Sequence, residues 1–160
     1  MSRMEARLLP DGRRLHLHDG PIDLIIGAEG GGDARALAFA AARGRFASIL
    51  DELCAELPLL RRPTAETPAG TVARRMWQAT RVHARSGFIT PMAAVAGAVA
   101  EEILAAMAAA AELHRAFVNN GGDIALHLAP GTSYRIGLVD RPDRPSLFAE
   151  ASLAAADQSR

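Results

Sequence analysis

The chain contains no lysine, because all 18 basic side chains among its 160 residues are arginines. A protein without lysine cannot form a Schiff base through a side-chain amine, use a lysine general base or carry the lysine of a P-loop. The absence therefore excludes several classes of enzyme. We attribute the arginine usage itself to genomic base composition, which also fits the frequent use of alanine.

An excess of charge of one sign is also missing. The 18 basic residues are balanced by 18 acidic residues, and no basic run is longer than two adjacent arginines. Nucleic acids and anionic membrane surfaces attract proteins with a net positive charge or a clear basic patch. We therefore expect neither a nucleic acid nor a membrane as partner. The glycine-rich loop over residues 119–123 favours a small molecule or nucleotide as ligand.

Cysteine is nearly absent, since Cys54 is the single one. The chain therefore has no internal disulfide and no paired-cysteine metal or redox site. The helical pattern around Cys54 predicts a buried structural thiol. The N-terminal residues 1–5 begin with charge and reach no apolar core of a signal peptide, which predicts a cytoplasmic protein.

The composition, with 49% apolar and 22% charged residues, is typical of one globular domain over residues 1–160. In residues 13–28, Leu15 and Leu17 alternate with histidines, and a second stretch rich in β-branched residues follows the turn Asp19-Gly20-Pro21. This pattern predicts an antiparallel β-hairpin. Asp33, after three glycines, is placed as the N-cap of the next helix.

Three helices are predicted after the hairpin. Apolar residues at helical spacing mark residues 34–57 and 71–84, with prolines punctuating the loop between them. Thr90-Pro91 is a typical helix start, and residues 92–113 are rich in alanine. Because Glu101 and Glu102 interrupt this last run, we predict a buried central helix and not a membrane span.

Strand-like segments follow over residues 116–118, 124–128, 134–139 and 146–153. Strands are grouped with strands and helices with helices. This order predicts an α+β fold, with the N-terminal hairpin, three helices and then an antiparallel sheet.

The loop Asn119-Asn120-Gly121-Gly122-Asp123 lies between two of these strands. Paired glycines let backbone amides approach an anion, and a neighbouring carboxylate can bind Mg²⁺ or a ribose hydroxyl. The same residues also suit an ordinary hairpin turn. Residue types alone leave both interpretations open.

Histidines offer a second group of candidate ligands. His16 and His18 share one face of a predicted strand, and His127 lies on another. Solvent-facing polar positions explain them as well, so we assign no metal site and no catalytic residue. The arginines of the second predicted helix could hold a phosphate or simply form a solvated face. These are Arg74, Arg75, Arg81 and Arg85.

Segments 88–102 and 118–125, together with the hairpin over 14–27, resemble the uncharacterised ApbE-like protein family. That family is related to the FAD:protein FMN transferases, which are magnesium-dependent and move FMN from FAD onto a protein threonine. The resemblance implies an ApbE-like fold, FAD or FMN as cofactor, and Mg²⁺. It also implies a flavin nucleotide site at the glycine loop. The implied binding residues are Thr90, Asn119, Asn120, Gly121, Gly122 and Asp123.

Two departures bear on the activity. The transferases carry a lysine where this chain has residues 95–98, and they continue past the equivalent of Leu153 into a region with metal ligands. We therefore expect a single ApbE-like domain truncated at its C-terminus, with an exposed apolar strip that favours a homo-oligomer. The expected function is flavin or nucleotide binding, with catalysis left open. The alternatives are a non-catalytic binding or assembly module with the same fold, and an enzyme acting on a different small molecule.

Overall fold

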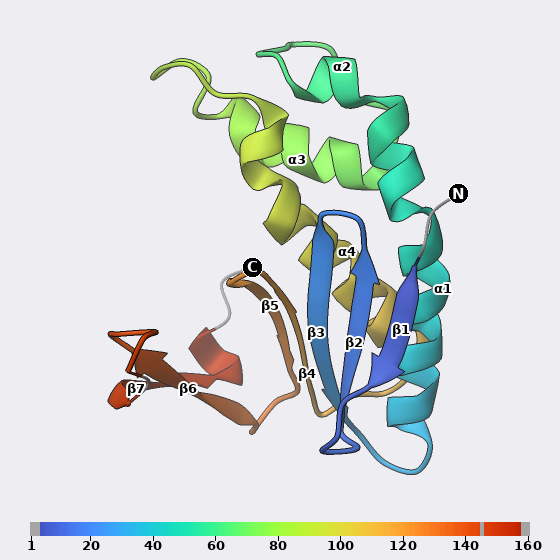
Figure 1. The fold of residues 1–160 in the computed structure, drawn as a ribbon, viewed down its shortest axis with the longest axis vertical. Helices are drawn as coiled ribbons and strands as arrows, with labels where there is room; N and C mark the ends of the chain where they lie inside the picture. The colour runs from blue at the N-terminus through green and yellow to red at the C-terminus, as the bar shows by residue number, and fades with distance from the viewer. Residues whose placement is uncertain (1–3, 145, 158–160) are drawn as a thin grey trace.

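The computed structural model describes residues 4–144 and 146–157, and its strands form two antiparallel sheets (Figure 1). The larger sheet has five strands in the order β1-β2-β3-β4-β5, and the smaller sheet pairs β6 with β7. The strands are β1 (Glu5–Leu8), β2 (Arg14–Asp19), β3 (Ile22–Glu29), β4 (Arg115–Asn120), β5 (Asp123–Leu128), β6 (Ser133–Val139) and β7 (Leu147–Ala154).

The helices all lie between β3 and β4 in sequence, apart from a short 3₁₀ turn, η2 (Ala155–Asp157). They are α1 (Ala34–Ala55), α2 (Leu57–Leu60), α3 (Thr71–Arg81), the 3₁₀ helix η1 (Pro91–Ala94) and α4 (Val95–Ala110). The α+β class and the N-terminal hairpin are confirmed. The expected number of three helices is wrong, because the short α2 forms in the proline-rich segment that was predicted as a loop. Pro58 is tolerated there because it occupies the first turn, where a missing N–H costs no hydrogen bond.

Pairing between β3 and β4 joins strands from either side of the helical region in one sheet. Ile26 lies opposite Val118, and Glu29 lies opposite Arg115. The sequence order suggested a hairpin and a separate later sheet, but β4 and β5 extend the sheet of the N-terminal hairpin, and β6 and β7 form the second sheet. β1, at the edge beside β2, was not predicted at all.

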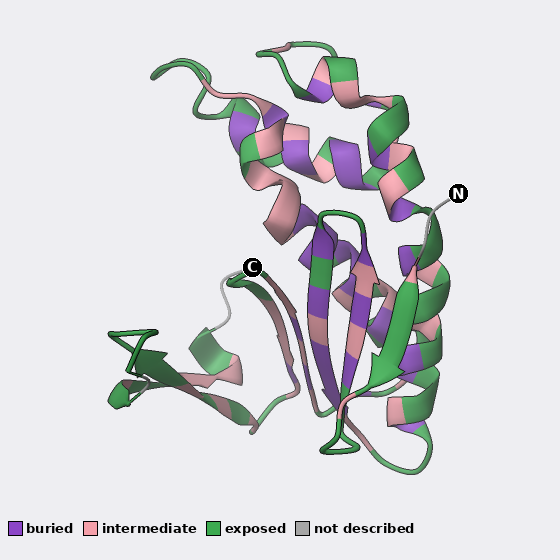
Figure 2. Ribbon diagram, in the orientation of Figure 1, coloured by how far each residue is buried: buried purple, intermediate pink, exposed green. Residues whose placement is uncertain are grey.

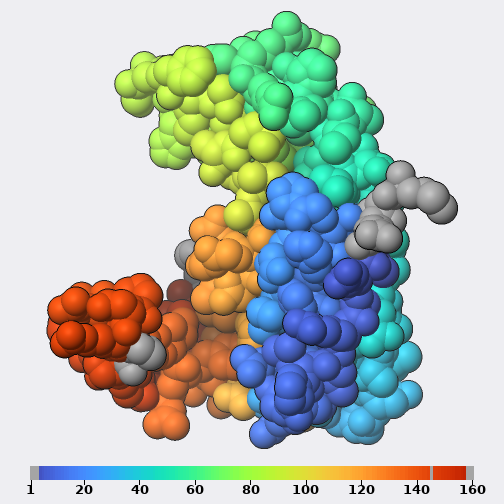
Figure 3. All heavy atoms as spheres, viewed as in Figure 1, coloured from blue at the N-terminus to red at the C-terminus, as the bar shows by residue number. Residues whose placement is uncertain are grey.

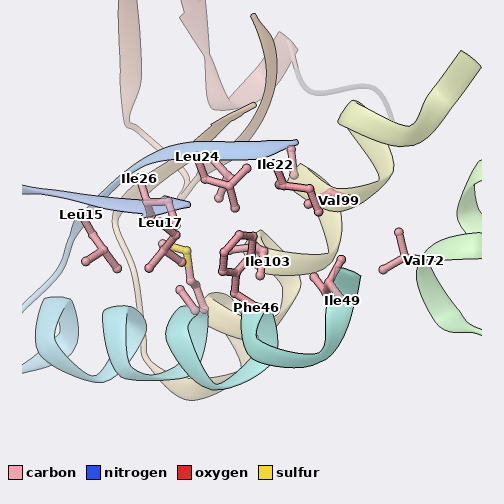
Figure 4. Close-up of a cluster of buried hydrophobic side chains, with 14 of the residues drawn as sticks. Leu15, Leu17, Ile22, Leu24, Ile26, Phe46, Ile49, Val72, Val99 and Ile103 are labelled. Atoms are coloured by element: carbon pink, nitrogen blue, oxygen red, sulfur yellow. The ribbon is translucent and has the colours of Figure 1, made fainter. Parts of the chain in front are cut away.

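The core lies between the larger sheet and the helices α1 and α4, which cover one of its faces (Figure 1). Leu15, Leu17 and Leu24 point from the strands toward Phe46 of α1 and Ile103 of α4 (Figure 4). Each of these five side chains is at most 1% exposed. The alternation in β2 that predicted a half-buried strand is thus confirmed.

Helix α4 packs on α1, α3, β4 and β5. Val99, Ile103 and Met107 are fully buried, so the predicted burial holds for one face of the helix, while 28% of its most apolar 18-residue window is buried overall. The Glu102 carboxylate accepts hydrogen bonds from Arg45 Nε at 2.8 Å and Arg75 Nε at 3.0 Å. The segment Pro91–Ala110 is long and apolar enough to cross a membrane by length and composition, a test that core helices also pass.

The start of this helix differs from the prediction. Pro91–Ala94 form a 3₁₀ turn, and the α-helix begins at Val95 and not at Met92. Thr90 is the N-cap of the 3₁₀ turn, but its side chain makes no capping hydrogen bond. Asp33 likewise precedes α1 without a side-chain cap.

Some apolar residues that were assigned to helix faces lie outside the core. Leu37 is 45% exposed and Val82 is 65% exposed. Cys54 is exposed, so the prediction of a buried thiol is wrong. The reason is the register of α1: Phe46 and Leu53 lie on its buried side, and Cys54, one residue after Leu53, is rotated by about 100° around the helix axis.

The β6–β7 hairpin stands apart from the rest of the molecule. The residues of β6 and β7 are exposed or intermediate. In β2 and β3, by contrast, buried residues alternate with less buried ones along most of each strand (Figure 2). In the space-filling view the hairpin projects to one side of the larger sheet (Figure 3). Leu138, Val139, Leu147 and Phe148 are exposed there.

Candidate functional site

The glycine loop forms a tight turn between β4 and β5. Asn120 lies opposite Asp123, and the two residues between them have φ values of 62° at Gly121 and 109° at Gly122. Both values are positive, a conformation that glycine adopts without steric cost. Asn119 Oδ1 accepts a hydrogen bond from the Gly122 amide at 2.9 Å. This amide is thus already bonded inside the turn, as in an ordinary two-residue hairpin.

Asp123 lines an open hollow of about 320 Å³ between α3, α4 and β5. Arg75 and Glu101 lie in the same hollow, and Arg75 Nη1 is 3.5 Å from Glu101 Oε2. The hollow thus contains two carboxylates, of Glu101 and Asp123, and one guanidinium, of Arg75, which is already paired with Glu101. This polar hollow therefore offers little attraction to a phosphate. It is lined by Arg75, Ala79, Ala94, Gly97, Ala98, Glu101, Asp123, Ile124 and Ala125.

Asn120 belongs to a different pocket, although it pairs with Asp123 across the turn. Its Nδ2 donates a hydrogen bond to the Ala96 carbonyl at 3.1 Å, which fixes the side chain against the first turn of α4. The six predicted binding residues therefore do not form one site. Asn120 lines one hollow and Asp123 lines another, whereas Thr90, Asn119, Gly121 and Gly122 line neither.

The second hollow, the apolar pocket, has a volume of about 390 Å³. It lies where the C-terminal half of α1, the turn between β2 and β3, and the start of α4 meet. Pockets for small organic ligands are typically of this size and mostly apolar, with a few polar groups that orient the ligand. The lining residues are Pro21, Ile22, Leu50, Leu53, Cys54, Leu57, Arg61, Met92, Val95, Ala96, Val99 and Asn120.

Arg61 supplies the only charge of this lining. Its guanidinium forms no ion pair with any residue that the structure describes, whereas that of the next residue, Arg62, lies 3.6 Å from Glu66. The sequence analysis missed Arg61. The sequence did contain a signal. An acidic residue three or four positions away can pair with an arginine on a helix, and Arg62 has one four positions later, whereas Arg61 has none at these positions in either direction.

The histidines of β2 share one acceptor on the sheet face opposite the helices. Asp23 Oδ2 lies 3.0 Å from His16 Nε2 and 3.2 Å from His18 Nδ1. The hydrogen bond from His16 lowers the pKa of the Asp23 carboxyl below its usual value. His127, on β5, lies 3.1 Å from the Leu113 carbonyl oxygen. The described residues contain no group of three or more His, Cys, Asp or Glu side chains able to hold a metal ion.

Comparison with known proteins gives one match. The model of the family described as "AbpE bacteria" matches residues 6–160. No curated protein and no solved structure matches the chain. The family is not the ApbE-like one to which the motifs were assigned, and no finding relates the chain to the FAD:protein FMN transferases. That assignment was wrong.

Structural demands account for the motifs that suggested it. Gly121-Gly122 closes a two-residue turn that needs positive φ at both positions. The small residues around Ala96 and Ala100 belong to a helix packed closely on β4 and β5. Folds without a common function share such requirements.

Proposed function

We propose a binding function for this chain, which belongs to the AbpE bacteria family. Its apolar pocket holds a small organic anion with a flat ring system, of the flavin or nucleotide class. The observation that carries the proposal is Arg61, a guanidinium without an acidic partner among the described residues, which lines the same pocket as Asn120. The rest of the lining is apolar apart from Cys54.

Each part of the pocket suits one part of such a ligand. The ring system packs between Leu53, Val95 and Val99, where each Å² of apolar surface removed from water contributes roughly 25 cal/mol. Arg61 donates charge-assisted hydrogen bonds to a phosphate. Asn120 Oδ1 accepts no hydrogen bond from the described part of the chain, and it can accept one from an N–H at the ring edge.

Binding without catalysis fits this lining best. No carboxylate, imidazole or lysine lines the apolar pocket, so the usual general acids and bases are missing from its described residues. Cys54 is the one nucleophile present. The proposal is therefore a ligand-binding module and not a transferase.

Calorimetry with matched ligands tests the proposal. FMN is compared with riboflavin, and AMP with adenosine, so that each pair differs only in its phosphate. Arg61→Gln is expected to weaken binding of the phosphorylated ligand about 10-fold, the factor for loss of a charge-assisted hydrogen bond of about 1.4 kcal/mol. The riboflavin or adenosine affinity should not change.

Arg62→Gln is the matched control, because it removes the neighbouring charge, which does not line the pocket. Cys54→Trp should weaken all four ligands by filling the pocket. Absence of binding by the wild-type protein, or equal effects of the two arginine variants, would contradict the proposal.

The expected Mg²⁺ dependence is tested in the same titrations. If Mg²⁺ strengthens binding and Asp123→Ala removes that effect, the ligand lies in the polar hollow. Because the Asp123 side chain is exposed and makes no hydrogen bond or ion pair with the described residues, the substitution should change the free energy of unfolding by less than about 0.5 kcal/mol. This outcome would move the site away from Arg61.

A further inference from the structure

Arg61 lies on a segment that has little regular structure of its own. The helix α2 has four residues, and the chain from Arg61 to Gly70 contains no helix or strand. A single helical turn is not stable in water without contacts to the rest of a protein. Leu60, which is fully buried, anchors the end of α2 in the core, but Arg61 itself is exposed. The position of its guanidinium therefore depends on what holds the remainder of the segment.

The side chain of Glu56 ties this segment to the start of α3. Its Oε2 accepts a hydrogen bond from the Ala69 amide at 2.8 Å, and its Oε1 accepts one from the Gly70 amide at 2.7 Å. Glu56 directly precedes α2, and Gly70 is the N-cap residue of α3. Hydrogen bonds to a carboxylate are stronger than those between neutral groups. The carboxylate therefore closes residues 57–69 into a loop, the α2 loop, which contains Arg61.

A second contact holds the middle of the α2 loop. The Trp77 indole Nε1 donates a hydrogen bond to the Thr64 carbonyl oxygen at 3.1 Å. Arg61 thus lies between two attachments to α3, one made by Glu56 and one made by Trp77. Because Trp77 is the single tryptophan, its indole N–H gives one signal that reports on the loop.

We propose that Glu56 is a positioning residue of the apolar pocket, which holds the Arg61 guanidinium through the α2 loop where a ligand phosphate binds. This inference rests on the proposed function. Glu56 does not line the pocket and so acts on the ligand only through Arg61. A guanidinium that is ordered before binding contributes more to affinity than one that must be ordered on binding. Loss of the carboxylate should therefore weaken the phosphate contact and leave the apolar contacts of the ring system in place.

Calorimetry with FMN and riboflavin on a double-mutant cycle tests this role. Glu56→Ala should weaken FMN binding about 5-fold and leave riboflavin binding unchanged. In the Arg61→Gln background the same substitution should leave FMN binding unchanged as well. Glu56→Gln, whose amide oxygen can still accept a hydrogen bond, should restore part of the affinity. A Glu56 that only stabilises the fold would affect the two ligands alike, in either background.

Gly70→Ala breaks the same contact from the other side. A methyl group at Gly70 would lie 2.8 Å from Glu56 Oε1, so the flexible carboxylate must move away. The φ of Gly70 is −68°, a value that alanine adopts, so the fold should be retained. This variant should reproduce the effect of Glu56→Ala on FMN binding. Glu66→Ala is the matched control, because Glu66 is exposed and pairs with Arg62 at 3.6 Å, and it should change neither affinity.

A measurement without ligand separates failure of this inference from failure of the proposed function. Nuclear magnetic resonance should show the Trp77 indole N–H exchanging with solvent faster in Glu56→Ala and Gly70→Ala than in the wild type or Glu66→Ala. Absence of FMN binding by the wild-type protein would overturn the proposed function and, with it, the role of Glu56. With wild-type binding intact, an unchanged indole exchange rate would overturn this inference alone. So would an effect of Glu56→Ala on FMN binding that persists in the Arg61→Gln background.

Discussion

The five-stranded sheet and the β6–β7 hairpin are built from the same kind of antiparallel, alternating strands, but only the first is covered. In β2, Leu15 and Leu17 are fully buried beneath α1 and α4 (Figure 4). In β6, Ile136 and Leu138 alternate in the same way, yet Leu138 remains 47% exposed. Alternation therefore specifies which side of a strand is apolar, and a covering element decides whether that side belongs to the core or to the surface.

The comparison predicts its largest effect at Phe46. Phe46→Ala should lower the free energy of unfolding by about 3–5 kcal/mol, because it leaves a cavity between α1 and the sheet. Phe148→Ala, the counterpart in the hairpin, should cost less than about 0.5 kcal/mol in dilute protein. Urea unfolding followed by circular dichroism measures both. Similar losses would mean that the hairpin is as tightly packed as the core.

The second largest loss of stability is expected on removal of the buried carboxylate of Glu102. Glu102 bonds to Arg45 and Arg75, so Glu102→Ala leaves both guanidinium groups without this partner and should cost about 3 kcal/mol. Glu101 is the control. It is next in sequence, but its side chain is 62% exposed, and Glu101→Ala should cost less than about 1 kcal/mol. Equal costs in urea unfolding would show that this network does not stabilise the helical layer.

Gly27, in the five-stranded sheet, lies against Phe117, the residue on which Tyr134 of the β6–β7 hairpin packs. A methyl group at this position would collide with the Phe117 ring, against which Tyr134 packs. Gly27→Ala should therefore cost about 1–3 kcal/mol and displace the hairpin as well. Gly44→Ala, in α1 and with nothing close to the added carbon, should instead stabilise by roughly 0.5–1 kcal/mol. Differential scanning calorimetry gives both signs, and destabilisation by Gly44→Ala would contradict this explanation.

The smallest predicted effect is a titration. Burial raises the pKa of the Tyr134 hydroxyl to about 12 from its usual 10.0. In that pH interval the unfolded chain has lost the phenolic proton and the folded chain retains it, so stability should fall as pH rises from about 10 to about 12.

Tyr134 is the single tyrosine, so phenolate absorbance reports on it alone. The absorbance midpoint should shift down to that of free tyrosine when the protein is unfolded in urea. Tyr134→Phe should remove the tyrosine contribution to the alkaline loss of stability. A midpoint near 10 in the folded protein would show that Tyr134 is not held against Phe117.

The site was predictable in part. The glycine turn was located, and its positive φ values follow from the residue types alone. The sequence could not show that Asn120 and Asp123 line different hollows, since this depends on how α4 crosses the end of β4. Arg61 and Cys54 were missed as pocket residues because their neighbours in the pocket come from distant parts of the chain.

By itself the sequence determined the hairpin of β2 and β3, the main helical segments and the turn at Gly121-Gly122. Each depends on interactions between residues a few positions apart, through periodicity and backbone preference. Only the tertiary structure decided that β3 pairs with β4, that Cys54 is exposed and that Arg61 and Asn120 line one pocket. These features depend on the docking of segments separated by the whole helical region, and no local pattern encodes the angle at which they meet.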